Sequence, residues 1–227
     1  MKSKLVIFGS SSYLCKIILN DLKKKYKIIC FSSKNSIPKK KNVKFINTDY
    51  SNKNIFFNLK KFIKKNDKIT VIFFNGVSEK SAFYTLKEKD INNILKVNLI
   101  KPIIITNIIL KNFLYNYPNF IYMSSSRAFY GDKGISVYSA SKIGLINFAK
   151  CLQLEYGSIN INFRVILIGL LKGGLKNILS EKKIKEIFSR SKIKNYITKK
   201  QILFSIFSAI STKKNSDVVI KCDNGYS

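Results

Sequence analysis

The sequence predicts one α/β domain, built on a doubly wound parallel sheet of about seven strands with helices on both faces. Its 227 residues are enough for a single domain with a substantial core. Short apolar runs alternate with amphipathic stretches along the whole chain, as in parallel sheets covered by helices. Several of these runs are continuously apolar, which is typical of strands buried on both faces. Because no repeat or low-complexity linker divides the chain, we interpret residues 1–227 as one domain.

The N-terminal half supplies four of the predicted strands. In chain order they are KLVIF (4–8), KIICF (27–31), VKFIN (43–47) and ITVIFF (69–74), with helices predicted at 12–25, 52–65 and 87–115. The first of these runs is too short for a signal-peptide core, so a cytoplasmic protein is expected. The stretch 97–114 is strongly apolar, but Lys101, Asn107 and Lys111 interrupt it. That pattern favours a buried helix over a membrane span.

The C-terminal half continues the same alternation. Strands are predicted at NFIYM (119–123), INFRVILI (161–168) and DVVIKC (217–222), and helices at 136–156, 174–189 and 198–211. The segment 170–197 is charged and the least strand-like part of the chain. In a doubly wound sheet it could cover the crevice at the carboxyl ends of the strands, and we expect it to cover the substrate there.

Histidine is absent from the chain, and this restricts the available chemistry. It removes Ser-His-Asp catalysis and nearly all ordinary zinc catalytic sites, so proton transfer must use Tyr, Lys, Asp, Glu or Cys. The four cysteines, Cys15, Cys30, Cys151 and Cys222, are scattered and form no CxxC pair. Reduced thiols in a cytosolic protein are therefore expected, and no metal site is predicted.

The formal net charge of +30 has two interpretations. It could reflect a nucleic-acid or acidic-membrane partner, or heavy use of Lys, Asn and Ile such as an AT-rich genome produces. The lysines are spread over every segment rather than gathered in one stripe, which favours the second interpretation. We therefore expect no nucleic-acid partner, although a basic surface would suit a phosphorylated ligand such as a dinucleotide.

The segment VIFGSSSYLCK (6–16) reads as a strand, a Gly-Ser turn and the start of a helix. Such a turn offers free N–H groups and the positive end of a helix dipole to a pyrophosphate. A full fingerprint has two more glycines. Cys15 takes the place of the last one, and the middle one falls on Ser12 or Tyr13. The candidate cofactor contacts here are Gly9, Ser11, Ser12, Tyr13 and Leu14, with the tyrosine side chain pointing away from the ligand. An ordinary serine-rich turn is the alternative.

The second predicted strand ends in Ser32, Ser33 and Lys34. Sites that prefer NAD place an acidic residue here, where it binds the 2′-hydroxyl of the ribose. A cation with hydroxyls suits a 2′-phosphate instead, so NADP is expected rather than NAD. A solvated loop is the alternative interpretation of the same residues.

The sequence VYSASKIGL (137–145) places Tyr138 and Lys142 four residues apart on a predicted helix, so both can face one site. A free tyrosine titrates near pH ~10, which is too high for efficient proton transfer at neutrality. A nearby ammonium group favours the phenolate and lowers the pKa of the phenol. The small residues between the two let a bulky cofactor approach.

The surrounding segment, residues 119–157, resembles the active-site segment of the short-chain dehydrogenase/reductase family, whose fold is Rossmann-like. The family's catalytic serine commonly precedes the tyrosine by thirteen residues, which points to Ser125. VNL (97–99) resembles the family's helix asparagine at Asn98, and TDY (48–50) the acidic residue that contacts adenine, at Asp49. DNGY (223–226) is similar to its closing Asp-Gly-Gly.

The resemblance implies a role for each of these residues. Tyr138 would be the general acid in carbonyl reduction, and Lys142 would lower the pKa of Tyr138 and bind the nicotinamide ribose. Ser125 would hydrogen-bond the substrate oxygen. Asn98 would hold a water that links Lys142 to solvent. A homodimer or homotetramer through the helices at 87–115 and 136–156 is also implied.

The chain departs from the family pattern in three places, all of them at cofactor contacts. The glycine turn is degraded. FFNG (73–76) replaces Asn-Asn-Ala-Gly, which leaves Asn75 and Gly76 as candidate contacts. After the sixth strand, Ile168-Gly169 replaces the usual Pro-Gly, and the threonine that often follows is glycine around Gly173. The departures therefore bear on the affinity for the cofactor, whereas the proton-transfer residues match the family pattern.

Three hypotheses for the function follow. The first is an oxidoreductase that uses NADP and acts on a small carbonyl or alcohol, such as a 3-oxoacyl thioester or a sugar. The second is a sugar-nucleotide epimerase or dehydratase of the extended branch, although the longer C-terminal domain of that branch is missing. The third is a non-catalytic dinucleotide- or nucleic-acid-binding protein, against which the trio Ser125, Tyr138 and Lys142 argues.

Overall fold

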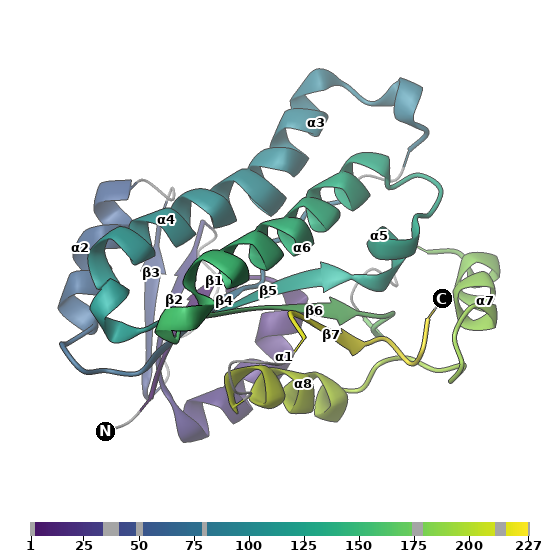
Figure 1. Cartoon of the computed structure of the whole chain (residues 1–227). Helices are drawn as coiled ribbons and strands as arrows, with labels where there is room; N and C mark the ends of the chain where they lie inside the picture. Colours follow the sequence, from purple (N-terminus) through teal and green to yellow (C-terminus); the bar gives the residue numbers. More distant parts are fainter. Residues whose placement is uncertain are drawn as a thin grey trace.

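The computed structural model describes residues 3–33, 41–48, 52–78, 81–173, 179–211 and 217–226. Its centre is a single parallel sheet in the strand order β3-β2-β1-β4-β5-β6-β7, which confirms the predicted fold class (Figure 1). The strands are β1 (Lys4–Phe8), β2 (Lys27–Ser32), β3 (Val43–Asn47), β4 (Ile69–Phe73), β5 (Asn119–Ser125), β6 (Asn162–Ile168) and β7 (Val219–Cys222). β5 runs two residues further than predicted, to Ser125, because it stays paired with β6 up to Ile168.

The order in which successive strands are added to the sheet reverses at β1, although all strands are parallel. From β1 it passes outward through β2 to β3, then returns to place β4 on the other side of β1. The loops that leave the carboxyl ends of β1 and β4 therefore diverge and open a crevice between them, where doubly wound sheets bind their ligands.

Helices cover both faces of the sheet. α1 (Tyr13–Lys25) and α8 (Lys199–Ser211) lie on one face, and α2 (Asn52–Phe62), α4 (Lys101–Phe113) and α6 (Ser136–Tyr156) lie on the other (Figure 1). Three shorter helices, α3 (Glu88–Leu95), α5 (Ser126–Tyr130) and α7 (Glu181–Ser189), extend beyond the sheet. The last two lie at the end toward which the arrowheads of β5, β6 and β7 point.

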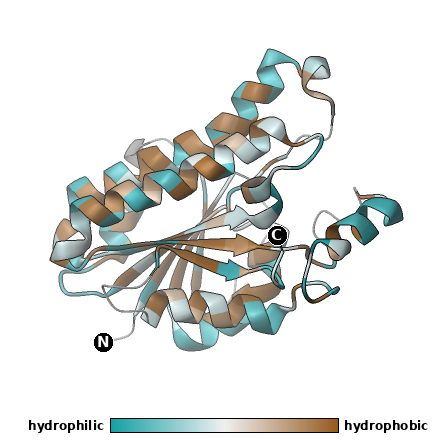
Figure 2. Cartoon of the chain, turned by 45° about the vertical axis from the view of Figure 1, so that its right-hand side comes forward, coloured by the Kyte–Doolittle hydropathy of each residue, from teal (hydrophilic) through white to brown (hydrophobic). Residues whose placement is uncertain are grey.

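The core forms two apolar layers, one on each face of the sheet. Side chains alternate along a strand, so Leu5 and Ile7 pack with α1 and α8, whereas Val6 and Phe8 pack with α2, α4 and α6. Figure 2 shows the result, since the strands are mostly brown, apart from short teal or pale stretches, and the helices turn teal faces outward. Burial on both faces explains why the strands read as continuous apolar runs.

Aromatic side chains form a stack across four neighbouring strands near their carboxyl ends. Phe31, Phe8, Phe73 and Tyr122 are in register, and successive ring centres are 4.8, 5.3 and 5.0 Å apart. The Tyr122 hydroxyl is 2.9 Å from the Thr106 hydroxyl of α4, so its polar end is satisfied inside the core. This stack supports the strand ends from which the candidate site is built.

The predicted helix at 87–115 is continuous but not uniform. α3 passes through a π-helical turn, Lys96–Ile100, into α4. By length and composition, Glu88–Asn116 is the one helix among the described residues that could cross a membrane, and 39% of its apolar window is buried. Ile105, Ile109 and Phe113 pack into the sheet core, as expected of the buried helix predicted here.

Three short elements of the described residues have no counterpart in the prediction. 3₁₀ helices cover Phe83–Thr85 and Gly157–Ile159, and α5 follows β5 directly. Elements this short contain too few residues to show a hydrophobic period. The predicted helix at 174–189 is observed as α7, Glu181–Ser189, and residues 174–178 lie outside the described part of the chain.

Candidate active site

A cavity of about 330 Å³ lies at the carboxyl ends of the central strands. Its walls come from the β1–α1 turn, the ends of β4, β5 and β6, and helix α6. They are formed by Ser12, Tyr13, Leu14, Phe74, Asn75, Gly76, Val77, Ser78, Met123, Ser124, Ser125, Arg127, Tyr138, Lys142, Ile168, Gly169, Leu170 and Leu171. Segments distant in the sequence thus meet at the edge where the topology predicts a ligand site.

The β1–α1 turn is fixed by its neighbours on both sides. The N–H groups of Gly9 and Ser10 both donate to the Phe31 carbonyl at the end of β2. Gly9 has φ +75°, and a Cβ there would lie 2.6 Å from the Asn75 nitrogen, so this position requires glycine. Ser12 caps α1 by accepting a hydrogen bond from the Cys15 N–H. The N-terminus of α1 therefore faces the cavity with its positive dipole end.

Tyr13 does not point away from the cavity, and the expectation that it would do so was wrong. Tyr13 lines the cavity, and its hydroxyl donates at 2.8 Å to the carbonyl of Lys172, which directly follows the lining residue Leu171. The reason is an acceptor on the loop after β6, which sequence spacing does not reveal. Leu14 also lines the cavity, while Gly9 and Ser11 lie outside its lining.

Tyr138 and Lys142 lie one turn apart on α6, and both line the cavity. The Lys142 Nζ is 5.9 Å from the centre of the Tyr138 ring. It donates to the carbonyl oxygens of Asn75 and Met123, each at 2.9 Å. An ammonium group has three N–H bonds, so one remains to serve a group in the cavity.

Burial is the main influence on the pKa of Lys142. The residue is 3% exposed, and desolvation lowers the pKa of its ammonium group from 10.5 to about 8. Among the described residues no carboxylate pairs with it, since its two recorded hydrogen-bond partners are backbone carbonyls. The site thus holds a cation whose charge responds to pH just above neutrality.

Ser125 ends β5 and stands at the N-terminus of α5. Its side chain makes no capping hydrogen bond to that helix, and it lines the cavity together with Tyr138. The neighbouring serines have structural partners instead, since the Ser124 hydroxyl donates to the Lys142 carbonyl and the Ser126 hydroxyl to the Asp223 carboxylate. Ser124 and Ser125 both line the cavity, but the Ser124 hydroxyl is already engaged with Lys142, so the Ser125 hydroxyl is the better placed of the two to meet a ligand.

Asn98 lies in the π-helical turn and is completely buried. Its amide donates to the Val77 carbonyl and the Ser141 hydroxyl, and its carbonyl accepts the Val77 N–H. The side chain therefore ties the loop after β4 to α6, beneath Tyr138 and Lys142. The water that the resemblance assigns to Asn98 stays a prediction.

Two features of the described residues fit a nicotinamide dinucleotide. The Asn75 Oδ1 is buried at the cavity wall without a hydrogen-bond partner, so a donor on a ligand would satisfy it. A Cβ at Gly76 would lie 3.7 Å from the Lys142 Nζ, which leaves room beside the ammonium group. Gly169 also lines the cavity, but packing requires it too, because a Cβ there would come within 2.9 Å of the Asp223 backbone.

The candidate residues for the adenosine half lie outside this cavity lining. Ser32 is buried at the end of β2, beside the β1–α1 turn, and Ser33 is exposed. Lys34 and Asp49 fall outside the described residues. No group of three or more His, Cys, Asp or Glu side chains that could hold a metal ion occurs in the described part of the chain.

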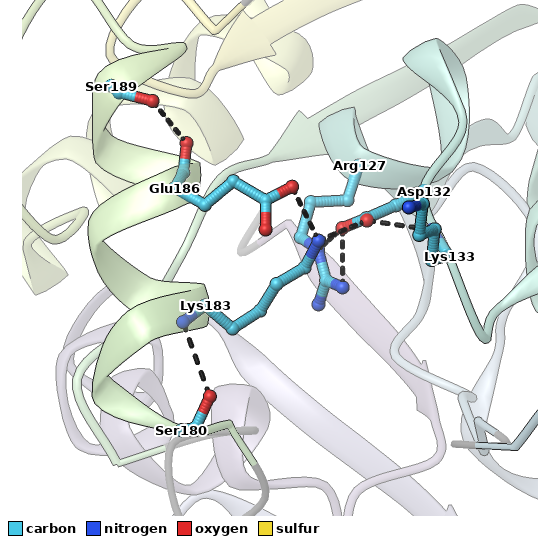
Figure 3. A network of polar contacts seen from close by, with 7 residues as sticks. All are labelled: Arg127, Asp132, Lys133, Ser180, Lys183, Glu186 and Ser189. Carbon is cyan, nitrogen blue, oxygen red and sulfur yellow. Dashed lines mark hydrogen bonds and ion pairs between the residues drawn. The ribbon is translucent and has the colours of Figure 1, made fainter.

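A network of charges beside the cavity was not found from the sequence (Figure 3). Arg127 lines the cavity, and both its Nε and an Nη lie 2.6 Å from one Asp132 oxygen. The Lys183 Nζ of α7 lies 2.6 Å from the other oxygen and 2.8 Å from Glu186. Burial alone would raise the pKa of Asp132, but hydrogen bonds from Lys183 and Arg127 outweigh it and lower the pKa. The network ties α7 to the loop that precedes Tyr138.

Lys183→Met is expected to lower the free energy of unfolding by roughly 1–3 kcal/mol, because it removes a charge-assisted bond to a nearly buried carboxylate. Urea unfolding measures the change. Lys182→Met is the matched control, because Lys182 is exposed on the same helix and should change stability by about 0.5 kcal/mol at most. Equal effects of the two substitutions would show that the network does not hold α7.

Comparisons with known proteins agree with this architecture. The family model described as short chain dehydrogenase matches residues 15–184, about three quarters of the chain. The chain is 30% identical over 173 residues to a 3-oxoacyl-[acyl-carrier-protein] reductase FabG of Buchnera aphidicola subsp. Baizongia pistaciae, covering 75% of this chain and 71% of that protein. It is 24% identical over 207 residues to the FabG of Rickettsia prowazekii, covering 90% and 77%.

Solved structures show the same fold at lower identity. A short chain dehydrogenase from Leptospira borgpetersenii with bound NAD+ matches with a TM-score of 0.87 and 16% identity, covering 99% of this chain and 92% of that one. ElxO with NADP bound matches with a TM-score of 0.84 and 18% identity, covering 100% and 99%. With the family model and the curated relatives, these findings establish that the chain belongs to the short-chain dehydrogenase/reductase family and is an NAD(P)-dependent oxidoreductase.

Proposed function

We propose that this enzyme reduces 3-oxoacyl thioesters with NADPH, using Ser125, Tyr138 and Lys142. The strongest support for the proposal is the arrangement of four residues around one cavity. Tyr138 and Lys142 line one cavity with Ser125, which has no helix-capping bond, and a buried Asn75 oxygen lacks a partner at the same wall. A binding protein without catalysis has no need for an acid, a cation and a hydroxyl gathered around one space.

In the proposed reaction Ser125 and Tyr138 act on the substrate carbonyl, and Lys142 acts on Tyr138. The bound nicotinamide supplies the hydride that reduces the carbonyl carbon. Ser125 donates a hydrogen bond to the carbonyl oxygen and stabilises the negative charge that develops there. Tyr138 transfers its phenolic proton to that oxygen, which completes the alcohol. Lys142 stabilises the resulting tyrosinate with its positive charge.

The preference for NADP is part of the same proposal. Ser32 and Ser33 end β2 without an acidic residue, and the sequence continues with Lys34. A formal net charge of +30 further favours the cofactor that bears the extra phosphate. The solved relatives include one with NAD+ and one with NADP bound, so either cofactor is compatible with the fold.

The thioester substrate rests on the curated relatives and on the character of the cavity. The FabG proteins that the chain resembles are named as 3-oxoacyl-[acyl-carrier-protein] reductases. In this chain, Leu170 and Leu171 form an apolar wall, and the described parts of the segment 170–197 would cover an acyl chain there. A related proposal is a cytoplasmic homodimer or homotetramer, for which Ile100 in the π-helical turn, Ile104 on α4 and Leu154 on α6 offer exposed apolar surface. Light scattering tests the oligomeric state.

The function is tested by initial rates of cofactor oxidation with a short 3-oxoacyl thioester, using NADPH or NADH. We expect turnover with NADPH, and a kcat/KM with NADH lower by about tenfold or more, equivalent to about 1.4 kcal/mol. A sugar nucleotide serves as the control substrate and should give no oxidation. Turnover of other carbonyls but not of the thioester would reject the substrate, and equal rates with NADH would reject the preference.

A further inference from the structure

Tyr13 connects two segments that lie far apart in the chain. It is the first residue of α1, and the residue is 43% exposed. Its hydroxyl donates to the backbone carbonyl of Lys172, 159 residues away, at 2.8 Å. This bond joins the β1–α1 turn to the loop that follows β6.

The loop after β6 is shaped to receive this tyrosine. Gly173 has φ +93°, and a Cβ there would lie 2.5 Å from the Tyr13 Oη and 2.9 Å from its Cζ. Any side chain at position 173 would therefore collide with the ring, in a conformation that only glycine adopts easily. A small residue facing a large one on separate segments indicates a fitted contact.

The contact spans the cavity of the candidate active site. Ser12, Tyr13 and Leu14 form one wall, and Leu170 and Leu171, which directly precede Lys172, form another. The N-terminus of α1, the end suited to phosphate groups, lies on the Tyr13 side. The bond to Lys172 therefore passes from the phosphate end of the site to the segment beyond the nicotinamide end.

We infer that Tyr13 acts as a strap that retains the bound dinucleotide, a role that rests on the proposed function. The strap is the Tyr13 side chain together with its bond to the Lys172 carbonyl. A ligand seated between the two walls leaves only after this bond breaks and the ring swings out. The strap compensates for the missing glycines of the phosphate turn, because it slows release where backbone contacts are fewer.

The inference predicts an effect on the release rate rather than on the chemical step. Tyr13→Phe keeps the ring and loses one hydrogen bond, so NADPH should dissociate about three- to tenfold faster. Tyr13→Ala removes the ring as well and should speed dissociation by more than tenfold. Gly173→Ala displaces the Tyr13 hydroxyl and should reproduce the effect of Tyr13→Phe from the opposite side of the contact.

The experiment is stopped-flow displacement of NADPH, followed by its fluorescence, with the full-length protein and these three variants. Tyr84→Phe is the matched control, since Tyr84 is 88% exposed and does not line the cavity. Melting temperatures of the ligand-free proteins verify folding. A structural role alone would lower these temperatures and leave the dissociation rate of the folded protein unchanged.

Each outcome decides the question. Faster dissociation in the Tyr13 and Gly173 variants, with the Tyr84 variant unchanged, supports the strap. Unchanged dissociation rates, or tighter binding by Tyr13→Ala, overturn it, and the second result identifies the ring as an obstruction. If the unmodified protein binds neither NADPH nor NADH, the proposed function fails and the strap fails with it, a result distinct from binding that ignores Tyr13.

Discussion

Tyr138→Phe is expected to reduce kcat by about 10²- to 10⁴-fold while the affinity for NADPH stays within about twofold. The substitution removes only the phenolic oxygen and its transferable proton. The ring remains on α6 against the same cavity wall, so the space for ligands is preserved. Steady-state rates with a 3-oxoacyl thioester, together with fluorescence titration of NADPH, separate the two effects.

Tyr156→Phe provides the matched control for this substitution. Tyr156 ends the same helix, is half-buried, and packs against Phe163 away from the cavity. Its loss of a hydroxyl should leave kcat unchanged. If Tyr138→Phe kept more than about a tenth of the activity, another group would have to supply the proton, and the assignment of the general acid would be wrong.

Lys142→Met is expected to lower kcat by about 10²-fold or more, because the tyrosinate loses the charge that stabilises it. The same substitution should change how stability depends on pH. Burial lowers the pKa of Lys142 from 10.5 to about 8. Between these values the unfolded chain carries the proton and the folded protein does not, so the contribution of Lys142 to the free energy of unfolding rises with pH.

Below pH 8 the buried ammonium group lowers the free energy of unfolding by about 3 kcal/mol, which corresponds to the change in the pKa of Lys142 from 10.5 to about 8. This cost is absent from Lys142→Met. The difference in unfolding free energy between the two proteins should therefore shift by about 2–3 kcal/mol in favour of the unmodified protein from pH 7 to pH 10. Urea unfolding at both pH values measures this difference.

Lys150→Met is the control for the pH effect, because Lys150 is exposed on α6, two turns beyond Lys142. It should leave both kcat and the pH dependence of stability as they are. A Lys142→Met protein whose stability parallels that of the unmodified protein at both pH values would show that the ammonium group is not desolvated as the fold implies.

The fold was predictable because burial leaves a local signature. The runs at 4–8 and 43–47 are observed as β1 and β3 with the predicted bounds. β7 begins two residues later than predicted, at Val219, where pairing with β6 holds its backbone. Ends of elements depend on such pairing, whereas their existence depends on apolar patterns within a few residues.

The site was predictable in part for a related reason. Helical periodicity alone puts Tyr138 and Lys142 on one face of α6, and the resemblance added Ser125. The network of Asp132 with Lys183 was missed because 51 residues separate the two, and no spacing rule connects them. The predicted orientation of Tyr13 was wrong because its hydrogen-bond partner, the Lys172 carbonyl, belongs to a loop without a regular sequence pattern.

By itself, the sequence determined the layered α/β fold, the crevice at the strand ends, and a phenol and an ammonium group one helical turn apart. These features depend on the alternation of apolar runs and on the period of a helix, which are local. Only the tertiary structure decided which neighbours close the site: the Asn75 and Met123 carbonyls on Lys142, the Asp132 network, and Tyr13 across the cavity. Such contacts join segments far apart in the chain, so they exist only once the register of the sheet and the packing of its loops have fixed where each segment lies.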